Sequence, residues 1–262
     1  ATVGDFGHTG ENLQISPGAR DLLSWNTTRT VCAVLLLIPL VHLVYLVASD
    51  TMAILDPSPD AWADEIRAYD RYDSVHQLPE DPILVIGGHR VKLWPGLEDL
   101  LAPRPVLMRG VGDATVNDIR KNYERLIGYY QPESVILLPS HSEFHIREFK
   151  SGPEMAAAIR KLVELDLYHG VTRHFYIFPP LKTPLHRNDD AKIEKTTDLL
   201  KGWAAGDERI IIVDGNDVLT DRNGAPKADF FRSDGINLND DGYLRLSMLL
   251  RQEFQASKIP GH

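Results

Sequence analysis

The chain has 262 residues, of which 43% are hydrophobic and 25% are charged, with a single cysteine. This composition excludes an intrinsically disordered protein, a collagen-like repeat and a disulfide-stabilised scaffold. The formal net charge is -9 at pH 7, and lysine and arginine form no cluster along the sequence. A nucleic-acid-binding protein is therefore also excluded, because contacts to phosphates need a basic face.

Near the N-terminus, residues 31–48 carry no formal charge. As a helix that rises about 1.5 Å per residue, this stretch nearly matches a hydrocarbon core of roughly 30 Å. We therefore predict a transmembrane helix at residues 30–49. We expect an uncleaved signal anchor rather than a signal peptide or a buried core helix, because a polar stretch with few cations precedes it and only His42 interrupts it. Arg20 and Arg29 precede the helix, which favours a cytoplasmic N-terminus and, in a bacterium, a periplasmic C-terminal part.

His42 has two interpretations. A neutral imidazole within a membrane span could ligate a haem or a chlorophyll-type pigment. It could instead contact a neighbouring helix, or bind a backbone carbonyl that Pro39 leaves without its donor. We favour the helix contact, and we expect no cofactor.

Two segments flank the predicted span. Residues 1–29 form a polar arm with few large apolar side chains, and we hypothesise that the arm and the transmembrane helix contact a larger integral membrane protein complex. Residues 50–80 are acidic and contain prolines, which indicates a linker with a short amphipathic helix around Trp62–Tyr69.

Over residues 81–262, short apolar β-branched runs alternate with helical periodicity. The runs predict strands at residues 83–86, 106–108, 134–138, 174–178 and 210–213, and the periodicity predicts helices at 115–130, 154–169, 190–204 and 240–254. Thr115 and Asp118 match a capping box at the start of the first helix. The alternation predicts an α/β fold with a doubly wound, five-stranded parallel sheet of flavodoxin-like topology, whose site lies at the carboxyl ends of the strands.

Four sequence blocks lie at these strand ends and before the last helix: IGGHRVKLWPGL, RGVGDATVND, LPSHSEFH and SDGINLNDDGYLRL. In this order and spacing they resemble the four blocks of the SGNH, or GDSL-type, hydrolase family over residues 82–254. The matching positions are Gly87, Leu93, Trp94, Gly110, Gly112, Thr115, Asp234, Gly235, Ile236, Leu238, Asn239, Gly242 and Tyr243. The resemblance implies an SGNH-hydrolase-like domain.

The residues that the family uses for chemistry differ in this chain. The resemblance aligns the nucleophilic serine with His89, the two oxyanion-hole residues with Asp113 and Ser142, and the general-base histidine with Asn237; only the orienting aspartate is retained, as Asp234. Acyl transfer by this route needs the nucleophile and its base. The sequence therefore predicts that the protein is not an enzyme but a membrane-anchored pseudoenzyme, a structural or assembly subunit of a respiratory, photosynthetic, secretory or cell-envelope complex.

One alternative is an active envelope esterase or acyltransferase with a rebuilt site. Ser140 and Ser142 are the nearby hydroxyl groups, and His141 or His145 would serve as the base. A binding module that keeps the old pocket for a small ligand or glycan is a further alternative.

Another alternative is a metal-dependent hydrolase. His89, Asp113, His141, His145 and Asp234 are predicted near one rim of the sheet, and imidazoles with carboxylates are suitable ligands for zinc and other transition metals. No ligand spacing among them is diagnostic, since two histidines in a loop segment HSEFH are a weaker signal than HExxH on a helix. The sequence therefore predicts no metal site.

Overall fold

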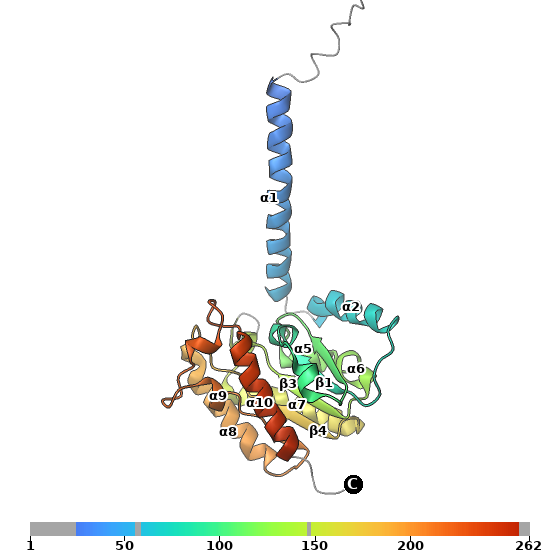
Figure 1. Cartoon of the computed structure of the whole chain (residues 1–262), viewed down its shortest axis with the longest axis vertical. Coiled ribbons are helices and arrows are strands. Elements are labelled where there is room, and N and C mark those ends of the chain that lie inside the picture. Colours follow the sequence, from blue (N-terminus) through green and yellow to red (C-terminus); the bar gives the residue numbers. More distant parts are fainter. Residues whose placement is uncertain (1–24, 56–58, 146–147, 257–262) are drawn as a thin grey trace, which may run out of the picture. The chain divides into compact units, whose positions relative to one another are not determined.

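The computed structural model of the chain describes residues 25–55, 59–145 and 148–256 (Figure 1). Of the polar arm predicted at residues 1–29, residues 1–24 lie outside this described part. The chain divides into two compact units, residues 1–51 and residues 52–262. Each unit is described by itself.

The described part of the first unit lies in helix α1, which spans Trp25–Leu55 and contains Pro39. Its residues Thr28–Ser49 have a mean hydropathy of 2.7 and none of this window is buried. Among the described residues α1 is the one helix long and apolar enough to cross a membrane, a property that signal sequences share. His42 shares a face of α1 with apolar side chains, and its side chain forms no hydrogen bond within the described part of the chain.

The second unit contains five parallel strands. They are β1 (Ile83–Gly87), β2 (Val106–Gly110), β3 (Ser134–Leu138), β4 (His174–Ile177) and β5 (Ile210–Ile212). Their order in the sheet is β2-β1-β3-β4-β5. This confirms the predicted doubly wound, flavodoxin-like topology, in which successive connections leave from the middle of the sheet in both directions.

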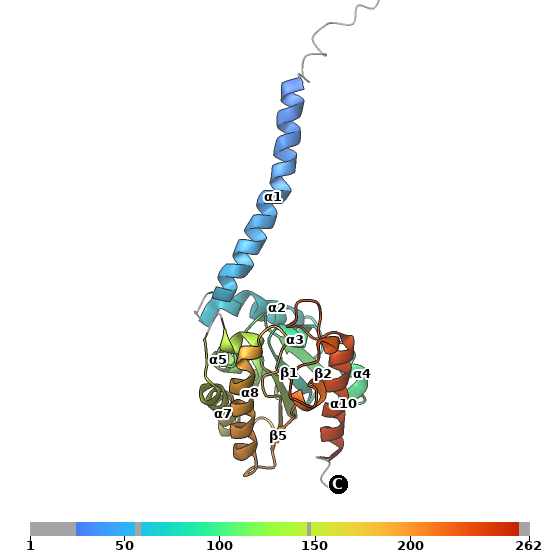
Figure 2. The same ribbon diagram turned by 90° about the vertical axis from the view of Figure 1, so that its left-hand side faces the viewer.

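Helices cover both faces of the sheet (Figure 2). One face is covered by α2 (Ala63–Asp73), α5 (Val116–Lys121), α6 (Tyr123–Leu126), α7 (Gly152–His169) and α8 (Asp190–Ala204). The other is covered by α3 (His89–Lys92), α4 (Leu97–Leu101), α9 (Asn216–Leu219) and α10 (Asp240–Ala256). Within β1, Leu84 and Ile86 face the first layer, and Ile83 and Val85 face the second. All four side chains are buried, as expected for a central parallel strand.

Short 3-10 helices complete the fold. They are η3 (Pro59–Trp62), η4 (Gly128–Tyr130), η5 (His141–Phe144), η6 (Arg187–Asp189) and η7 (Ala228–Phe230).

The helix predicted at residues 115–130 begins as expected but does not run through. The capping box is present, because Thr115 Oγ1 accepts from the N–H of Asp118 at 3.2 Å and Asp118 Oδ2 accepts from the N–H of Thr115 at 3.0 Å. The helix is interrupted at Asn122, whose side-chain Nδ2 donates to the carbonyl of Asp118 at 3.0 Å. An asparagine side chain that binds a carbonyl one turn back competes with helix continuation. The prediction of a single helix is therefore wrong.

The acidic segment after α1 contributes to the core of the second unit. Trp62 and Ile66 of this segment are 5% and 3% exposed. The indole Nε1 of Trp62 donates to Asp118 Oδ2 at 3.3 Å. This segment, which the sequence led us to expect as a linker, thus packs α2 directly against the sheet.

Candidate active site

The loops after β1, β2 and β3 meet at the carboxyl edge of the sheet. β1 lies between β2 and β3, and its last residue, Gly87, is in register with Gly110 and Leu138. The first loop leads into α3, the second carries Asp113, and the third leads into η5. In doubly wound sheets, sites lie at the point where the connections diverge in this way. The structure therefore brings the family-like blocks together at one edge.

The first and third blocks supply no paired nucleophile. His89 is exposed at the start of α3, and its side chain has no hydrogen-bond or ion-pair partner among the residues described. Ser140 is buried against Gly88, where a Cβ would lie 3.1 Å from its Oγ. Its hydroxyl caps η5 by accepting from the N–H of Ser142 at 3.2 Å, and it lies 3.5 Å from Asp113 Oδ1. Within the described residues no histidine hydrogen-bonds this hydroxyl, so Ser140 lacks the adjacent base that activates a serine.

The last block forms a closed local network. Asp234 Oδ2 accepts from Asn237 Nδ2 at 2.8 Å, and Oδ1 accepts from the N–H groups of Ile236 and Asn237 at 2.8 and 2.9 Å. Slight burial raises the pKa of Asp234, but these hydrogen bonds outweigh it and hold the pKa below its usual value. Asp234 thus orients Asn237, an amide that cannot carry a proton near neutral pH.

Arg90 is the buried cation of this edge. The residue is 2% exposed, and its Nη2 donates to the carbonyl of Ile236 at 2.8 Å. Its Nε and Nη1 have no partner in the described part of the chain. Burial lowers the pKa of Arg90, while Tyr243, Asp113 and Asp234 act in the opposite direction. Buried donors without partners cost free energy, and an anionic group that reached Nε or Nη1 would offset that cost.

His141 and Asp113 form the second element of the site. His141 Nδ1 lies 3.9 Å from Asp113 Oδ1, too far for a direct hydrogen bond. Burial, together with the positive charge of Arg90, lowers the pKa of His141 to about 4. The imidazole is therefore neutral at pH 7 and able to accept a hydrogen bond from water.

A third group, which the sequence did not predict as a unit, consists of His145, His186 and Asp189; we call it the histidine cluster. His145 Nε2 lies 2.5 Å from Asp189 Oδ2, and the rings of His145 and His186 are 4.1 Å apart. The rings of His186 and His141 are nearly parallel, with their centroids 6.3 Å apart. The cluster therefore lies next to the site. Only His145 was among the candidates from sequence. His186 and Asp189 flank the short turn before α8, where no spacing motif signals a site.

One backbone donor of the second block is already used. The N–H of Gly112, adjacent to Asp113, donates to Glu65 Oε2 at 2.9 Å, and Lys92 Nζ lies 2.5 Å from the same oxygen. Glu65 belongs to α2. This amide is therefore not free to stabilise a developing oxyanion, whereas Arg90 keeps two nitrogen atoms without partners among the described residues.

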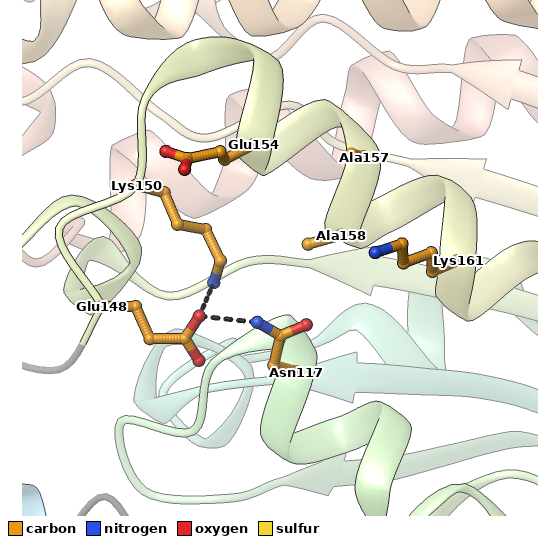
Figure 3. A pocket seen from close by; sticks show the side chains of 7 residues that line it. All are labelled: Asn117, Glu148, Lys150, Glu154, Ala157, Ala158 and Lys161. Atoms are coloured by element: carbon orange, nitrogen blue, oxygen red, sulfur yellow. Dashed lines mark hydrogen bonds and ion pairs between the residues drawn. The ribbon is translucent and has the colours of Figure 1, made fainter.

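A separate cavity of about 280 Å³ lies between the start of α5 and α7 (Figure 3). Three of its polar residues contact one another: Glu148 Oε2 lies 2.7 Å from Lys150 Nζ and accepts from Asn117 Nδ2 at 2.6 Å. Thr115 Oγ1 donates to the other carboxylate oxygen at 2.6 Å. These contacts give the cavity a structural role in joining α5 to the segment before α7.

Comparison with solved structures assigns the α/β unit to a fold family. No protein-family model and no curated protein matches the sequence. A protein named for platelet activating factor, from Streptococcus pneumoniae, has a TM-score of 0.61 and 18% identity over 72% of this chain and 91% of its own. A Bacteroides fragilis protein named as an acylhydrolase has a TM-score of 0.61 and 16% identity over 73% and 96%. A GDSL-like lipase from Bacteroides thetaiotaomicron has a TM-score of 0.59 and 14% identity over 73% and 98%.

The α/β unit therefore has the SGNH-hydrolase fold, as the sequence blocks indicated. The comparison also corrects one expectation. Proteins with this fold are named as lipases, acylhydrolases and acetylxylan esterases, which points to hydrolase activity and contradicts the prediction that the chain is not an enzyme. That prediction rested on the loss of the family's serine and histidine, and it took no account of Arg90 or of His186 and Asp189.

Proposed function

We propose that the protein is a hydrolase of carboxylic esters that uses water, rather than a serine, as the attacking group. The observation that carries this proposal is the buried guanidinium of Arg90, with two unpartnered nitrogen atoms, beside a neutral His141 and the carboxylate of Asp113. The ester class follows from the neighbours of this fold, which are named as acylhydrolases and lipases.

In the proposed reaction, a water molecule held between His141 and Asp113 attacks the acyl carbon. Its proton passes to one of these two groups, the carbonyl oxygen takes up negative charge, and Arg90 stabilises that charge. The ester C–O bond then breaks, the alcohol leaves with that proton, and the carboxylic acid releases the second proton of the water to solvent and remains as a carboxylate. Removing one donor to such an oxyanion typically lowers the rate by about a hundred- to a thousandfold.

The test is hydrolysis of an aryl acetate by the full-length chain in detergent. Asp113→Asn keeps the shape of the side chain, and His141→Gln keeps a polar group but removes the imidazole; we expect each to lower kcat/KM by about a hundredfold. His76→Gln is the matched control, because His76 is exposed and stacks on Tyr72 away from the site, and it should retain the activity. Folded wild-type protein without activity above the protein-free rate would overturn the proposal.

We propose further that α1 anchors this hydrolase in a membrane and joins it to an integral membrane protein complex. The supporting observation is His42, a polar side chain on an exposed apolar face with no hydrogen-bond partner among the described residues. A polar group in hydrocarbon is stabilised by a neighbouring helix. The cations before the span favour a cytoplasmic N-terminus and a periplasmic α/β unit.

Purification in mild detergent, followed by mass spectrometry of the bound chains, tests this role. We expect defined partners whose recovery falls several-fold in His42→Leu and is unchanged in Leu36→Ala, a substitution outside the His42 face. Protease treatment of spheroplasts should cleave the α/β unit. Recovery of the chain without bound partners from a mild-detergent extract would contradict the proposed complex. Protection of the α/β unit from protease in spheroplasts would contradict its periplasmic location.

A further inference from the structure

The histidine cluster has the ligand types of a transition-metal site. His145 and His186 each offer a ring nitrogen and Asp189 a carboxylate oxygen, and these ligand atoms lie within 4.8 Å of one another. Two imidazoles with one carboxylate suit zinc and related divalent ions. Asp189 is 3% exposed and both histidines are half-buried, so the group is a shielded one rather than a set of solvated surface charges.

Local backbone structure places these ligands on one side. His186 and Asp189 are three residues apart around η6, and the N–H of Asp189 donates to the carbonyl of His186 at 3.1 Å. In a 3-10 turn, side chains at this spacing eclipse one another. His145 comes from a distant segment, at the end of η5, where its N–H donates to the carbonyl of Ser142 at 3.3 Å. Two short turns thus present three ligands to a common point.

The surroundings of the cluster orient the carboxylate. Asp189 Oδ1 lies 2.8 Å from Lys192 Nζ, which leaves Oδ2 directed at His145. An outer contact of this kind fixes a metal-ligating carboxylate. Arg187, the nearest other cation in sequence, is paired with Asp190 at 2.8 Å.

The space at the cluster fits one small ion. A cavity of about 10 Å³ is lined by the cluster together with His141, Phe144 and Thr183, which is about the space that one water molecule occupies. Two ligands on a tetrahedral zinc with bonds of roughly 2.0 Å are separated by about 3.3 Å. Since His145 Nε2 and Asp189 Oδ2 are 2.5 Å apart, an ion would replace the proton between them and move them apart by less than one ångström.

We propose that His145, His186 and Asp189 bind one divalent transition-metal ion of the zinc class, with a water molecule in the remaining position. The ion cross-links the turn after β3 to the turn before α8 and thereby holds the position of His141. This metal site is separate from the proposed ester hydrolysis, and metal binding there does not depend on that activity.

The experiment uses the full-length chain in detergent, stripped of metal with a chelator and then dialysed against zinc or titrated with cobalt. We expect one zinc per chain and visible cobalt absorption bands of low-symmetry coordination. His186→Ala and Asp189→Asn should each weaken binding by more than about tenfold. His89→Ala is the matched control, because His89 is an exposed histidine on the same edge of the sheet, and it should bind as the wild type does.

Circular dichroism establishes that each variant is folded. Zinc should raise the Tm of the wild type and of His89→Ala, but not the Tm of His186→Ala or Asp189→Asn. Absence of stoichiometric metal on folded wild-type protein overturns the proposal. Equal binding by His186→Ala and Asp189→Asn also overturns it. Because these readouts report binding alone, zinc binding without ester hydrolysis would contradict the proposed function and leave the metal site standing.

Discussion

Arg109 Nη2 lies 2.5 Å from Asp73 Oδ1, and this ion pair joins β2 to the end of α2 in the interior of the α/β unit. The side chains are 6% and 2% exposed. Tyr130 completes the group, since its hydroxyl donates to Asp73 Oδ2 at 2.6 Å and accepts from Arg109 Nε at 2.8 Å. The acidic segment before the sheet is therefore fixed to the domain by a buried charge network.

Removing one member of this network should be costly, because the other charge remains buried without its partner. We expect Asp73→Ala to lower the free energy of unfolding by about 3–5 kcal/mol. Asp70→Ala is the matched control on the same helix, since the Asp70–Arg125 pair has the same 2.5 Å separation but is about half exposed; it should change stability by less than about 1 kcal/mol. Urea unfolding of both variants checks this, and equal effects would contradict it.

Gly112 is a position where the fold requires glycine. Its φ is +29°, and a Cβ there would lie 2.0 Å from Trp62 Cζ3. We expect Gly112→Ala to destabilise the protein by at least about 1–3 kcal/mol, through overpacking against a buried ring.

Gly202 provides the contrasting case. It lies within α8, and a Cβ there would meet nothing within 4 Å. Gly202→Ala should stabilise the protein by about 0.5–1 kcal/mol, since alanine loses less conformational entropy in a helix. Thermal unfolding of the two variants should therefore show Tm shifts of opposite sign, and shifts of the same sign would refute this account of Gly112.

His141 makes stability depend on pH. Burial lowers its folded-state pKa to about 4 from 6.5, so between these values the unfolded chain binds a proton that the folded chain does not. The stabilisation is complete above about pH 6.5 and is lost as pH falls through 4, with a size on the order of 3 kcal/mol. Wild type should therefore lose more stability than His141→Gln between pH 7 and pH 4. Parallel curves for the two proteins would show that His141 is not buried as a neutral ring.

Much of the fold could be predicted from the sequence. The central strands β1 and β3 are buried on both faces and therefore need apolar residues at consecutive positions, as in Ile83–Ile86. The limits of α8 followed equally well from its periodicity. The break at Asn122 did not, since it arises from a side-chain bond to a carbonyl that competes with the helix without changing the apolar stripe.

The site was less accessible to sequence reasoning. The family blocks located the correct edge, and Asp234 and Asn237 do bind each other as their chemistry suggested. The histidine cluster, by contrast, joins His145 to residues about forty positions later, and only the packing of η5 against η6 brings them together. The burial of Arg90 was equally hidden from the sequence. It depends on the loop around Ile236, which is distant in the chain and whose carbonyl accepts from Arg90, while two other nitrogen atoms of Arg90 have no partner in the described residues.

Ester hydrolysis by water without a serine nucleophile can be examined on one sample of wild-type protein. Hydrolysis of an aryl acetate and labelling by a fluorophosphonate probe, which reacts with activated serines, are measured side by side. We expect hydrolysis above the protein-free rate with no covalent label on any serine. Labelling of Ser140, or absence of hydrolysis by folded protein, would contradict it.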